Sequence, residues 1–398
     1  MTQQPRPFMV PPTALAPELG APGPPRRVET HGGAVWLVSR YEDVRTCLSS
    51  PAFSHATTWA VENGYPPPAG GLFTGTMLGA EPPEHTRLRK LVSGAFTARR
   101  IEALAPRIRQ ITGALLDDIA ALGRADLVRD LAFPLPIRVI CELLGVPSAD
   151  WKSFQGWADT MFRPGGTPEE LATARDASQQ LWEYIRGLVD AKRRTPGEDL
   201  ISGLVAAHED EDRLSYDEVI ANSRLLLHAG YDTTANFIGN AALALLTRPE
   251  TARRLAGDPE LLRGAVDELL RHDGPSQVNM RFANQDTEIA GVGIRRGEQI
   301  VLDLEAAHRD PEVFPDGDDI DPGRSPNPHL TFGHGIHYCI GSPLARLEGR
   351  IALGELFARF ADLRLAVPVA EVRRRPASAL HGVVALPVEF TPAPAGRA

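Results

Sequence analysis

Residues Phe332 to Gly341 combine one cysteine with several glycines and histidines, in the sequence FGHGIHYCIG, directly before a predicted helix that begins near Ser342. Glycines let the backbone turn sharply and approach a flat ligand closely. Backbone N–H groups and the positive end of the following helix favour the thiolate form of Cys339 over the thiol. A buried thiolate that faces a flat partner is what a haem iron requires of a protein.

Simpler interpretations compete with a haem thiolate. A lone cysteine is most often a small buried hydrophobe, and we expect this of Cys47 and Cys141. Zinc would require paired ligands, whereas this segment offers a single thiolate among unpaired histidines. A dinucleotide-binding loop would require the third glycine of the pattern GxGxxG, three residues after Gly335, and a convincing parallel strand before Gly333, and the sequence shows neither.

A second group lies in the middle of a long helix predicted at residues 215–246, in the sequence AGYDTT from Ala229 to Thr234. Glycine and threonine are unfavourable inside a helix, and a threonine hydroxyl there can redirect a backbone hydrogen bond. We therefore expect a local distortion that opens a groove over a ligand. The alternative is an exposed Asp232 beside a Thr233 that packing tolerates.

Two charged pairs occur at helical spacing. Glu268 and Arg271 are three residues apart on one helix face, so their charges can meet, although most such pairs lie on solvated faces. His85 and Arg89 are four residues apart and project from one helix, where they suit a pair of carboxylates.

The segment FGHGIHYCIG resembles the haem-binding signature of the cytochrome P450 family and matches every signature position. The other groups follow in the family's order, and the resemblance runs from about Trp36 to Phe390, including PLPIRVICELLGVP at 134–147 and HRDPEVFPD at 308–316. It is closest to soluble bacterial members that tailor natural products. The resemblance implies a mainly α (α+β) domain at residues 36–398 around a buried haem b, with an extended Pro-rich arm at residues 1–35.

The resemblance also implies roles for single residues. Cys339 would be the axial ligand of the haem iron. The other cofactor-binding residues would be His85, Arg89, Arg281 and His337 at the propionates, together with Phe332, Gly333, Ala229 and Gly230. Asp232 and Thr233 resemble the family's proton-delivery pair. Arg324, in the sequence DPGR, would join Glu268 and Arg271 in bracing the loop that carries Cys339.

A cytochrome P450 monooxygenase hydroxylates or epoxidises a hydrophobic molecule with O₂, and the resemblance implies a secondary-metabolite intermediate: a polyketide, macrolide, terpenoid or aromatic compound. Oxidative C–C or C–O coupling at the same centre is an alternative, and a haem-binding sensor or scaffold is a non-enzymatic one. Because no reductase segment follows Pro387, we expect separate proteins to supply electrons, and the resemblance implies that these are a ferredoxin and its reductase. Their docking patch would comprise Arg89, Lys90, Arg99, Arg100, Arg346 and Arg350.

An apolar substrate pocket is expected over the haem. Its candidate residues are Phe73, Met77, Leu225, His228, Val278 and Leu380. His228 stands where the family usually has an apolar residue, so we expect it to hydrogen-bond a polar group of the substrate, the alternative being a core histidine bound to the backbone. Glu81 and His381 also depart from the usual residues, Asp and Arg. The segment Pro164–Gly166 would suit a lid hinge or an ordinary loop.

Amphipathic periodicity predicts the helices that must position these residues: 83–95, 98–122, 136–145, 148–162, 168–193, 197–208, 215–246, 258–272 and 342–361. Thr167-Pro168-Glu169-Glu170 has the pattern of a capping box. Short strands are expected at 34–40, 288–294, 299–304, 363–367 and 383–390. Because no linker separates helical from β-rich portions, we expect one domain.

The chain has 398 residues, with 42 Lys and Arg against 51 Asp and Glu, a net charge of −9 that disfavours nucleic acid as a partner. No stretch approaches 18 apolar residues, and the N-terminus lacks the pattern of a signal peptide. The three cysteines form no disulfide framework. We therefore expect a soluble, cytoplasmic monomer that does not contact membranes.

Overall fold

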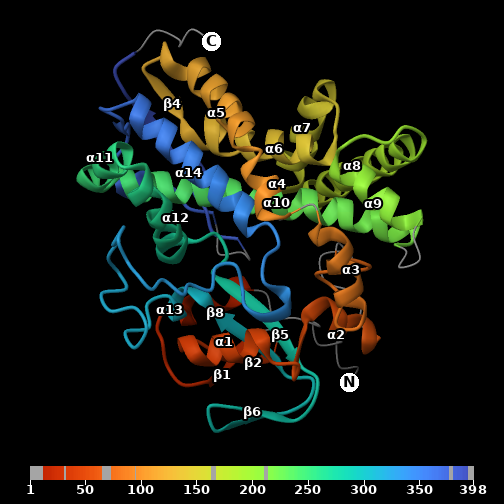
Figure 1. Ribbon diagram of the computed structural model, residues 1–398. Coiled ribbons are helices and arrows are strands. Elements are labelled where there is room, and N and C mark those ends of the chain that lie inside the picture. The colour runs from red at the N-terminus through yellow and green to blue at the C-terminus, as the bar shows by residue number, and fades with distance from the viewer. Residues whose placement is uncertain are drawn as a thin grey trace.

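The computed structural model describes residues 12–30, 33–64, 73–94, 96–162, 167–209, 214–375 and 380–392. Helices make up most of the molecule, and a smaller β-rich part lies to one side of them (Figure 1). The helices are α1 (Tyr41–Ser49), α2 (Ala56–Glu62), α3 (Glu84–Ser93), α4 (Ala98–Glu102), α5 (Ala105–Ala120), α6 (Pro134–Leu144), α7 (Trp151–Phe162), α8 (Pro168–Arg194), α9 (Leu200–Glu209), α10 (Tyr216–Leu246), α11 (Pro249–Gly257), α12 (Pro259–Asp273), α13 (Leu304–Ala307) and α14 (Ser342–Arg359).

The predicted helices are confirmed, with local differences. The stretch 98–122 contains two helices, α4 and α5, and Pro106 lies in the first turn of α5, where proline is tolerated. Helix α11 was not predicted, and the chain turns at Thr247 and Arg248 before it begins. The predicted capping box is present: Thr167 Oγ1 accepts a hydrogen bond from the backbone N–H of Glu170.

Helix α10 runs through the centre of the molecule, and α14 crosses nearby (Figure 1). Most α10 side chains are buried because α6, α12 and α14 all pack against it. A helix that is buried on most of its sides is typical of the core rather than the surface. Its polar residues therefore require partners inside the protein.

The strands form three small sheets. The largest has the order β1 (Arg26–Thr30), β2 (Gly33–Val38), β8 (Gln299–Asp303), β5 (Val278–Ala283), β3 (Phe53–His55), and β2 and β8 are its parallel pair. The second contains β4 (Arg124–Asp126), β10 (Pro387–Glu389) and β9 (Arg364–Leu365), and the third contains β6 (Thr287–Ile289) and β7 (Val292–Ile294).

Two features of the sheets differ from the predictions. The expected boundary between arm and domain, after residue 35, falls inside β2, because residues 26–30 form β1 and Val28 packs in an apolar cluster with Leu15 and Val35. The strand expected at 288–294 is a hairpin, since Ala290 and Gly291 both have positive φ and reverse the chain between β6 and β7.

Among the described residues, no helix is both long enough and apolar enough to span a membrane. All three cysteines are free thiols, and Cys47 and Cys141 are buried in the core as expected.

Candidate functional site

The loop before α14 carries Cys339. The backbone N–H of Cys339 donates to the carbonyl of Phe332 over 2.9 Å, which closes the loop. Gly333 and Gly335 both have positive φ, near +73° and +74°, and a Cβ on Gly335 would lie 2.8 Å from the Cα of Ser49. Glycine is therefore required there both by conformation and by close packing against α1.

The Sγ of Cys339 faces a cavity, and the N–H groups of Gly341 and Ser342 hydrogen-bond to it. Burial raises the pKa of the Cys339 thiol, and this effect exceeds the lowering by those N–H groups and by Arg89 and Arg346. The donors predicted to favour the thiolate are therefore present, and desolvation acts against them. A bound metal removes such a proton on coordination, so the sulfur remains suitable as a ligand.

A buried ion cluster supports the loop. Glu268 and Arg271 of α12 form two hydrogen bonds of 2.8 Å, and Arg324 Nε lies 3.1 Å from Glu268 Oε2. Asn327 and the backbone N–H of Asp321 also donate to the Glu268 carboxylate. These bonds lower the pKa of Glu268 despite its burial. The three predicted residues are thus together, and they anchor the segment that leads to Cys339.

Arg271 also ties that segment to its surroundings. Its two Nη atoms donate to the backbone carbonyls of His308, Gly317 and Asp319, over 2.8, 2.7 and 2.8 Å. The side chain is fully buried. The guanidinium donors of Arg271 that do not bind Glu268 are therefore used for positioning backbone.

The four residues predicted to bind carboxylates converge beside the Cys339 loop. His85 and Arg89 come from α3 and Arg281 from β5, and the rings of His85 and His337 lie 4.5 Å apart. Within the described part of the chain, the buried Nε2 atoms of His85 and His337 make no hydrogen bond. Burial lowers the pKa of His85 to about 4 and that of Arg281 to about 10.

Buried imidazole nitrogens that make no hydrogen bond are costly unless a further group binds there, and an anion suits them because Arg89 and Arg281 lie beside them. Two propionates would supply such an anion. The donors present therefore fit a haem, with Cys339 at its iron.

Sequence reasoning missed His55, which joins this group from β3. Its backbone N–H donates to Glu81 Oε1 over 3.0 Å, and its ring lies 6.1 Å from that of His337. Glu81 Oε2 lies 3.5 Å from His337 Nε2. The pairing of His55 with Arg281 across β3 and β5 brings it here. A contact between segments more than 200 residues apart left no local signal in the sequence.

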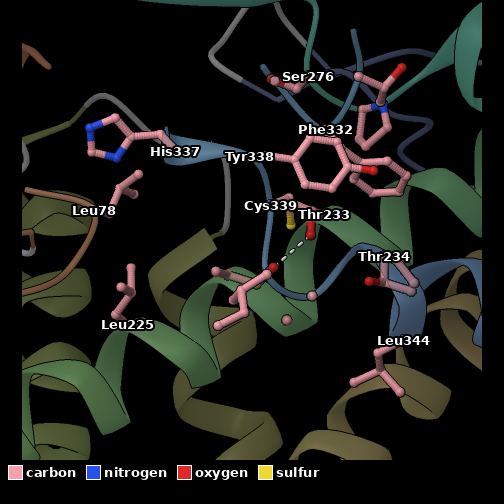
Figure 2. A pocket seen from close by; sticks show the side chains of 18 of the residues that line it. Leu78, Leu225, Thr233, Thr234, Ser276, Phe332, His337, Tyr338, Cys339 and Leu344 are labelled. Carbon is pink, nitrogen blue, oxygen red and sulfur yellow. Dashed lines mark hydrogen bonds between the residues drawn. The ribbon is translucent and has the colours of Figure 1, made fainter. Parts of the chain in front are cut away.

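Thr233 lines the same cavity as Cys339 (Figure 2). Its hydroxyl donates to the carbonyl of Ala229 over 2.6 Å, as a mid-helix threonine can. Helix α10 nevertheless continues without interruption from Tyr216 to Leu246, so the predicted distortion does not break it. Ala229 and Gly230 also line the cavity, and a Cβ on Gly230 would lie 3.1 Å from Ile140.

Asp232 is buried beside the cavity and is not among its lining residues. Asn236 Nδ2 donates to Asp232 Oδ1 over 2.9 Å, and Arg375 Nη1 donates to the same oxygen over 3.3 Å. Burial raises the pKa of Asp232 and outweighs the lowering by Arg375 and Asn236. Asp232 and Thr233, the predicted acid and alcohol, are thus neighbours in sequence, but the Thr233 side chain lines the cavity and the Asp232 side chain is buried behind its lining.

Three of the substrate-pocket candidates, Met77, Leu225 and Leu380, line the cavity. Val278 belongs to a separate apolar cluster with Leu15. Alternation along β5 explains this, because Asn279 and Arg281 point into the cavity and their neighbours point away.

Phe73 and His228 have ring centroids 6.3 Å apart, and neither is among the described lining residues. The pKa of His228 is lowered to about 4 by burial and by Arg224. Leu78, Leu344 and Ser276 line the cavity without having been predicted (Figure 2). The proposed hinge at 164–166 lies outside the described residues.

The basic residues expected on a docking patch differ in their surroundings. Arg346 Nε donates to Asp267 over 2.7 Å, and its guanidinium lies 4.5 Å above the ring of Phe332. Arg89 Nη2 donates to the carbonyl of Tyr338 over 2.6 Å. Arg346 and Arg89 therefore also support the Cys339 loop.

The sequence profile of the family described as Cytochrome P450 matches residues 165–363. The cytochrome P450 monooxygenase PikC of Streptomyces venezuelae is 42% identical over 392 residues, covering 96% of this chain and 92% of PikC. The mycinamicin IV hydroxylase/epoxidase of Micromonospora griseorubida is 43% identical over 362 residues, covering 90% of each protein. The crystal structure of SgvP, described as a putative thioether synthase in the tailoring step of griseoviridin, has a TM-score of 0.86 at 40% sequence identity. The match covers 98% of this chain and 100% of SgvP.

The helical fold and the Cys339 loop beneath a central helix define a haem-thiolate oxygenase. The chain belongs to the cytochrome P450 family and is a cytochrome P450 monooxygenase. The cofactor of this family is haem b.

Proposed function

We propose that this protein hydroxylates or epoxidises a hydrophobic natural-product intermediate, a macrolide or another polyketide. The observation that carries the proposal is the cavity between Cys339 and Thr233, whose lining is mainly apolar and includes Met77, Leu225 and Leu380. The similarity to PikC, a cytochrome P450 monooxygenase, and to the mycinamicin IV hydroxylase/epoxidase supports it. An apolar cavity with few polar groups favours such a substrate, because desolvating a strongly polar one would be costly.

The haem supplies the iron at which O₂ is activated for insertion into the substrate. Cys339 would bind the iron, and His85, Arg89, Arg281 and His337 would bind the propionates. Thr233 would present its hydroxyl to the cavity and pass a proton there, and Asp232 would resupply it. Glu268, Arg271 and Arg324 would act on none of these steps and would hold the Cys339 loop in place.

A spectrum of the reduced CO adduct tests the iron ligand. A Soret band at the long wavelength of thiolate-ligated haem is expected for fresh protein, and a band at the position of a neutral ligand would contradict ligation by Cys339. The same measurement on Cys47→Ser, a buried cysteine away from the cavity, should match the wild type.

A spin-state titration of the ferric holoenzyme against macrolactones, terpenoids and aromatic compounds tests the substrate class. Macrolactones should bind most tightly, and turnover with a ferredoxin and its reductase should add one oxygen atom by mass spectrometry. Leu225→Phe, which narrows the cavity, should weaken binding at least about tenfold, a loss of about 1.4 kcal/mol. Equal or tighter binding of aromatic compounds would overturn the proposed class.

His228 contacts a polar group of the substrate in the same proposal. His228→Leu should then weaken binding of the preferred macrolactone and change the product pattern. Unchanged affinity and products would show that His228 only packs against Phe73.

We also propose that a ferredoxin docks on the Cys339 side of the protein, where Lys90, Arg99 and Arg100 are exposed. Charge attraction between exposed patches speeds association and weakens as salt is added. Arg99→Gln with Arg100→Gln should therefore lower the rate of ferredoxin-driven reduction and its salt dependence, while reduction by dithionite is unchanged. A ferredoxin rate that keeps its wild-type salt dependence would remove these residues from the docking site.

A further inference from the structure

Arg375 lies far from α10 in sequence but reaches its buried acid. Its Nη1 donates to Asp232 Oδ1 over 3.3 Å, and the side chains of Arg375 and Asp232 are only 15% and 5% exposed. The guanidinium also lies 5.0 Å from the ring centroid of Phe133. An ion pair this shielded interacts more strongly than one at the surface.

The segment that carries Arg375 is held firmly. The backbone N–H of Arg375 donates to the carbonyl of Gly382 over 2.8 Å, and Arg374 pairs with Val383 as an antiparallel bridge. A Cβ on Gly382 would lie 1.9 Å from Asn236 Oδ1. Asn236 in turn donates to the Asp232 side chain, so Gly382 contacts both residues that hydrogen-bond to the acid, Arg375 and Asn236. We call Arg375, Gly382 and Asn236 the frame around Asp232.

The chain just before Gly382 reaches the cavity, since Leu380 lines it. The backbone N–H of His381 donates to the carbonyl of Pro275, another lining residue, over 2.7 Å. The frame around Asp232 is therefore continuous with the wall of the substrate cavity.

We infer that Arg375 is a positioning residue for proton delivery, which keeps the Asp232 carboxylate charged and oriented behind Thr233. The inference rests on the role proposed above for Asp232 and adds the partner that controls it. Among the described residues, Arg375 is the charged group that acts on Asp232, and Asn236, its other side-chain hydrogen-bond partner, carries no titratable side chain.

The electrostatic consequence follows from two opposing effects. Burial raises the pKa of Asp232, and the Arg375 charge lowers it. An opposite charge at this range typically lowers a carboxyl pKa by about 1–3. Without Arg375 the carboxyl would stay protonated to higher pH and would release its proton less readily.

Infrared difference spectroscopy of the holoenzyme, with Asp232→Asn to identify the band, measures this directly. In Arg375→Gln the pH at which the Asp232 carboxyl ionises should rise by at least about 1, and in Arg375→Lys it should return toward the wild-type value. An unchanged midpoint in Arg375→Gln would overturn the inference.

A second measurement follows the proton itself. The dithionite-reduced holoenzyme is mixed with air-saturated buffer. Its return to the ferric state is then followed from about pH 5 to about pH 9. Arg375→Gln should shift the pH profile, and the shift should vanish in the Arg375→Gln/Asp232→Asn double variant. A shift that persists there would mean that Arg375 acts only on the structure.

Arg374→Gln is the matched control, because Arg374 belongs to the same segment but pairs with Asp273 over 2.9 Å. In Arg374→Gln, both the pH at which the Asp232 carboxyl ionises and the pH profile of reoxidation should match the wild type. If Asp232→Asn alone leaves the pH profile unchanged, the proposed role of Asp232 fails. The infrared result still decides whether Arg375 controls that carboxyl.

Discussion

Glu268 and Asp232 are both buried carboxylates that meet an arginine from a distant segment, yet their hydrogen bonding is unlike. Glu268 accepts bonds from Arg271, Arg324, Asn327 and the backbone of Asp321. Asp232 accepts from Asn236 and, at 3.3 Å, from Arg375. Burial acts on both, but the pKa of Glu268 is lowered and that of Asp232 is raised.

The difference shows how the same charge pair can serve two purposes. A carboxylate with every lone pair satisfied is locked in its ionised form and is suited to holding a loop. A carboxylate with fewer donors lies nearer the balance between its two protonation states, which a proton donor requires. The variants below test this contrast in order of decreasing effect.

Glu268→Gln should have the largest effect. It leaves Arg271, which is fully buried, without its counter-charge, and breaking a buried pair costs about 3–5 kcal/mol. Urea unfolding of the holoenzyme measures the loss. A cost below about 1 kcal/mol would show that the cluster is not the support of the Cys339 loop.

Gly382→Ala should follow, since the new Cβ would meet Asn236 Oδ1 at 1.9 Å. Overpacking of this kind costs about 1–3 kcal/mol and should also move the Asp232 carboxyl midpoint. Gly257→Ala is the control, because a Cβ there meets nothing within 4 Å. Equal stabilities of the two variants would show that the frame around Asp232 is loose.

The pH dependence of unfolding should separate the two carboxylates. The stabilisation from Glu268, whose folded pKa is lowered, is present above its unfolded pKa and is lost as pH falls through the folded pKa. The contribution of Asp232, whose folded pKa is raised, is present at low pH and is lost as pH rises through the folded pKa. The stability gap between wild type and Glu268→Gln should therefore narrow on acidification.

The difference in stability between wild type and Asp232→Asn should change in the opposite sense. The wild type should lose stability relative to the variant as the pH rises above the ordinary carboxyl pKa of about 4. Urea unfolding at a series of pH values gives both slopes. Slopes of the same sign would refute the contrast between the two sites.

Arg374→Gln should have the smallest effect. Its side chain is 40% exposed, so the ion pair with Asp273 is screened by solvent and contributes at most about 1 kcal/mol. A larger loss in urea unfolding would mean that the Arg374–Asp273 pair, rather than Arg375, anchors the segment to the helices.

Local patterns were sufficient for much of this protein. The periodicity of α8 and α10, the capping box at Thr167, and the i,i+3 and i,i+4 pairs at Glu268–Arg271 and His85–Arg89 are short-range features, so the sequence shows them directly. The positive φ of Gly333 and Gly335 is likewise a local feature of the backbone, whereas the close approach of Gly335 to Ser49 is not.

Contacts between distant segments could not be derived in this way. The sequence by itself determined most of the helices and the cysteine loop, because helix periodicity and glycine conformation are local. Only the tertiary structure decided that Arg375 meets Asp232, that His55 lies near His337 and that Val278 faces away from the cavity. Such pairings depend on the packing of whole elements, and no short-range pattern encodes them.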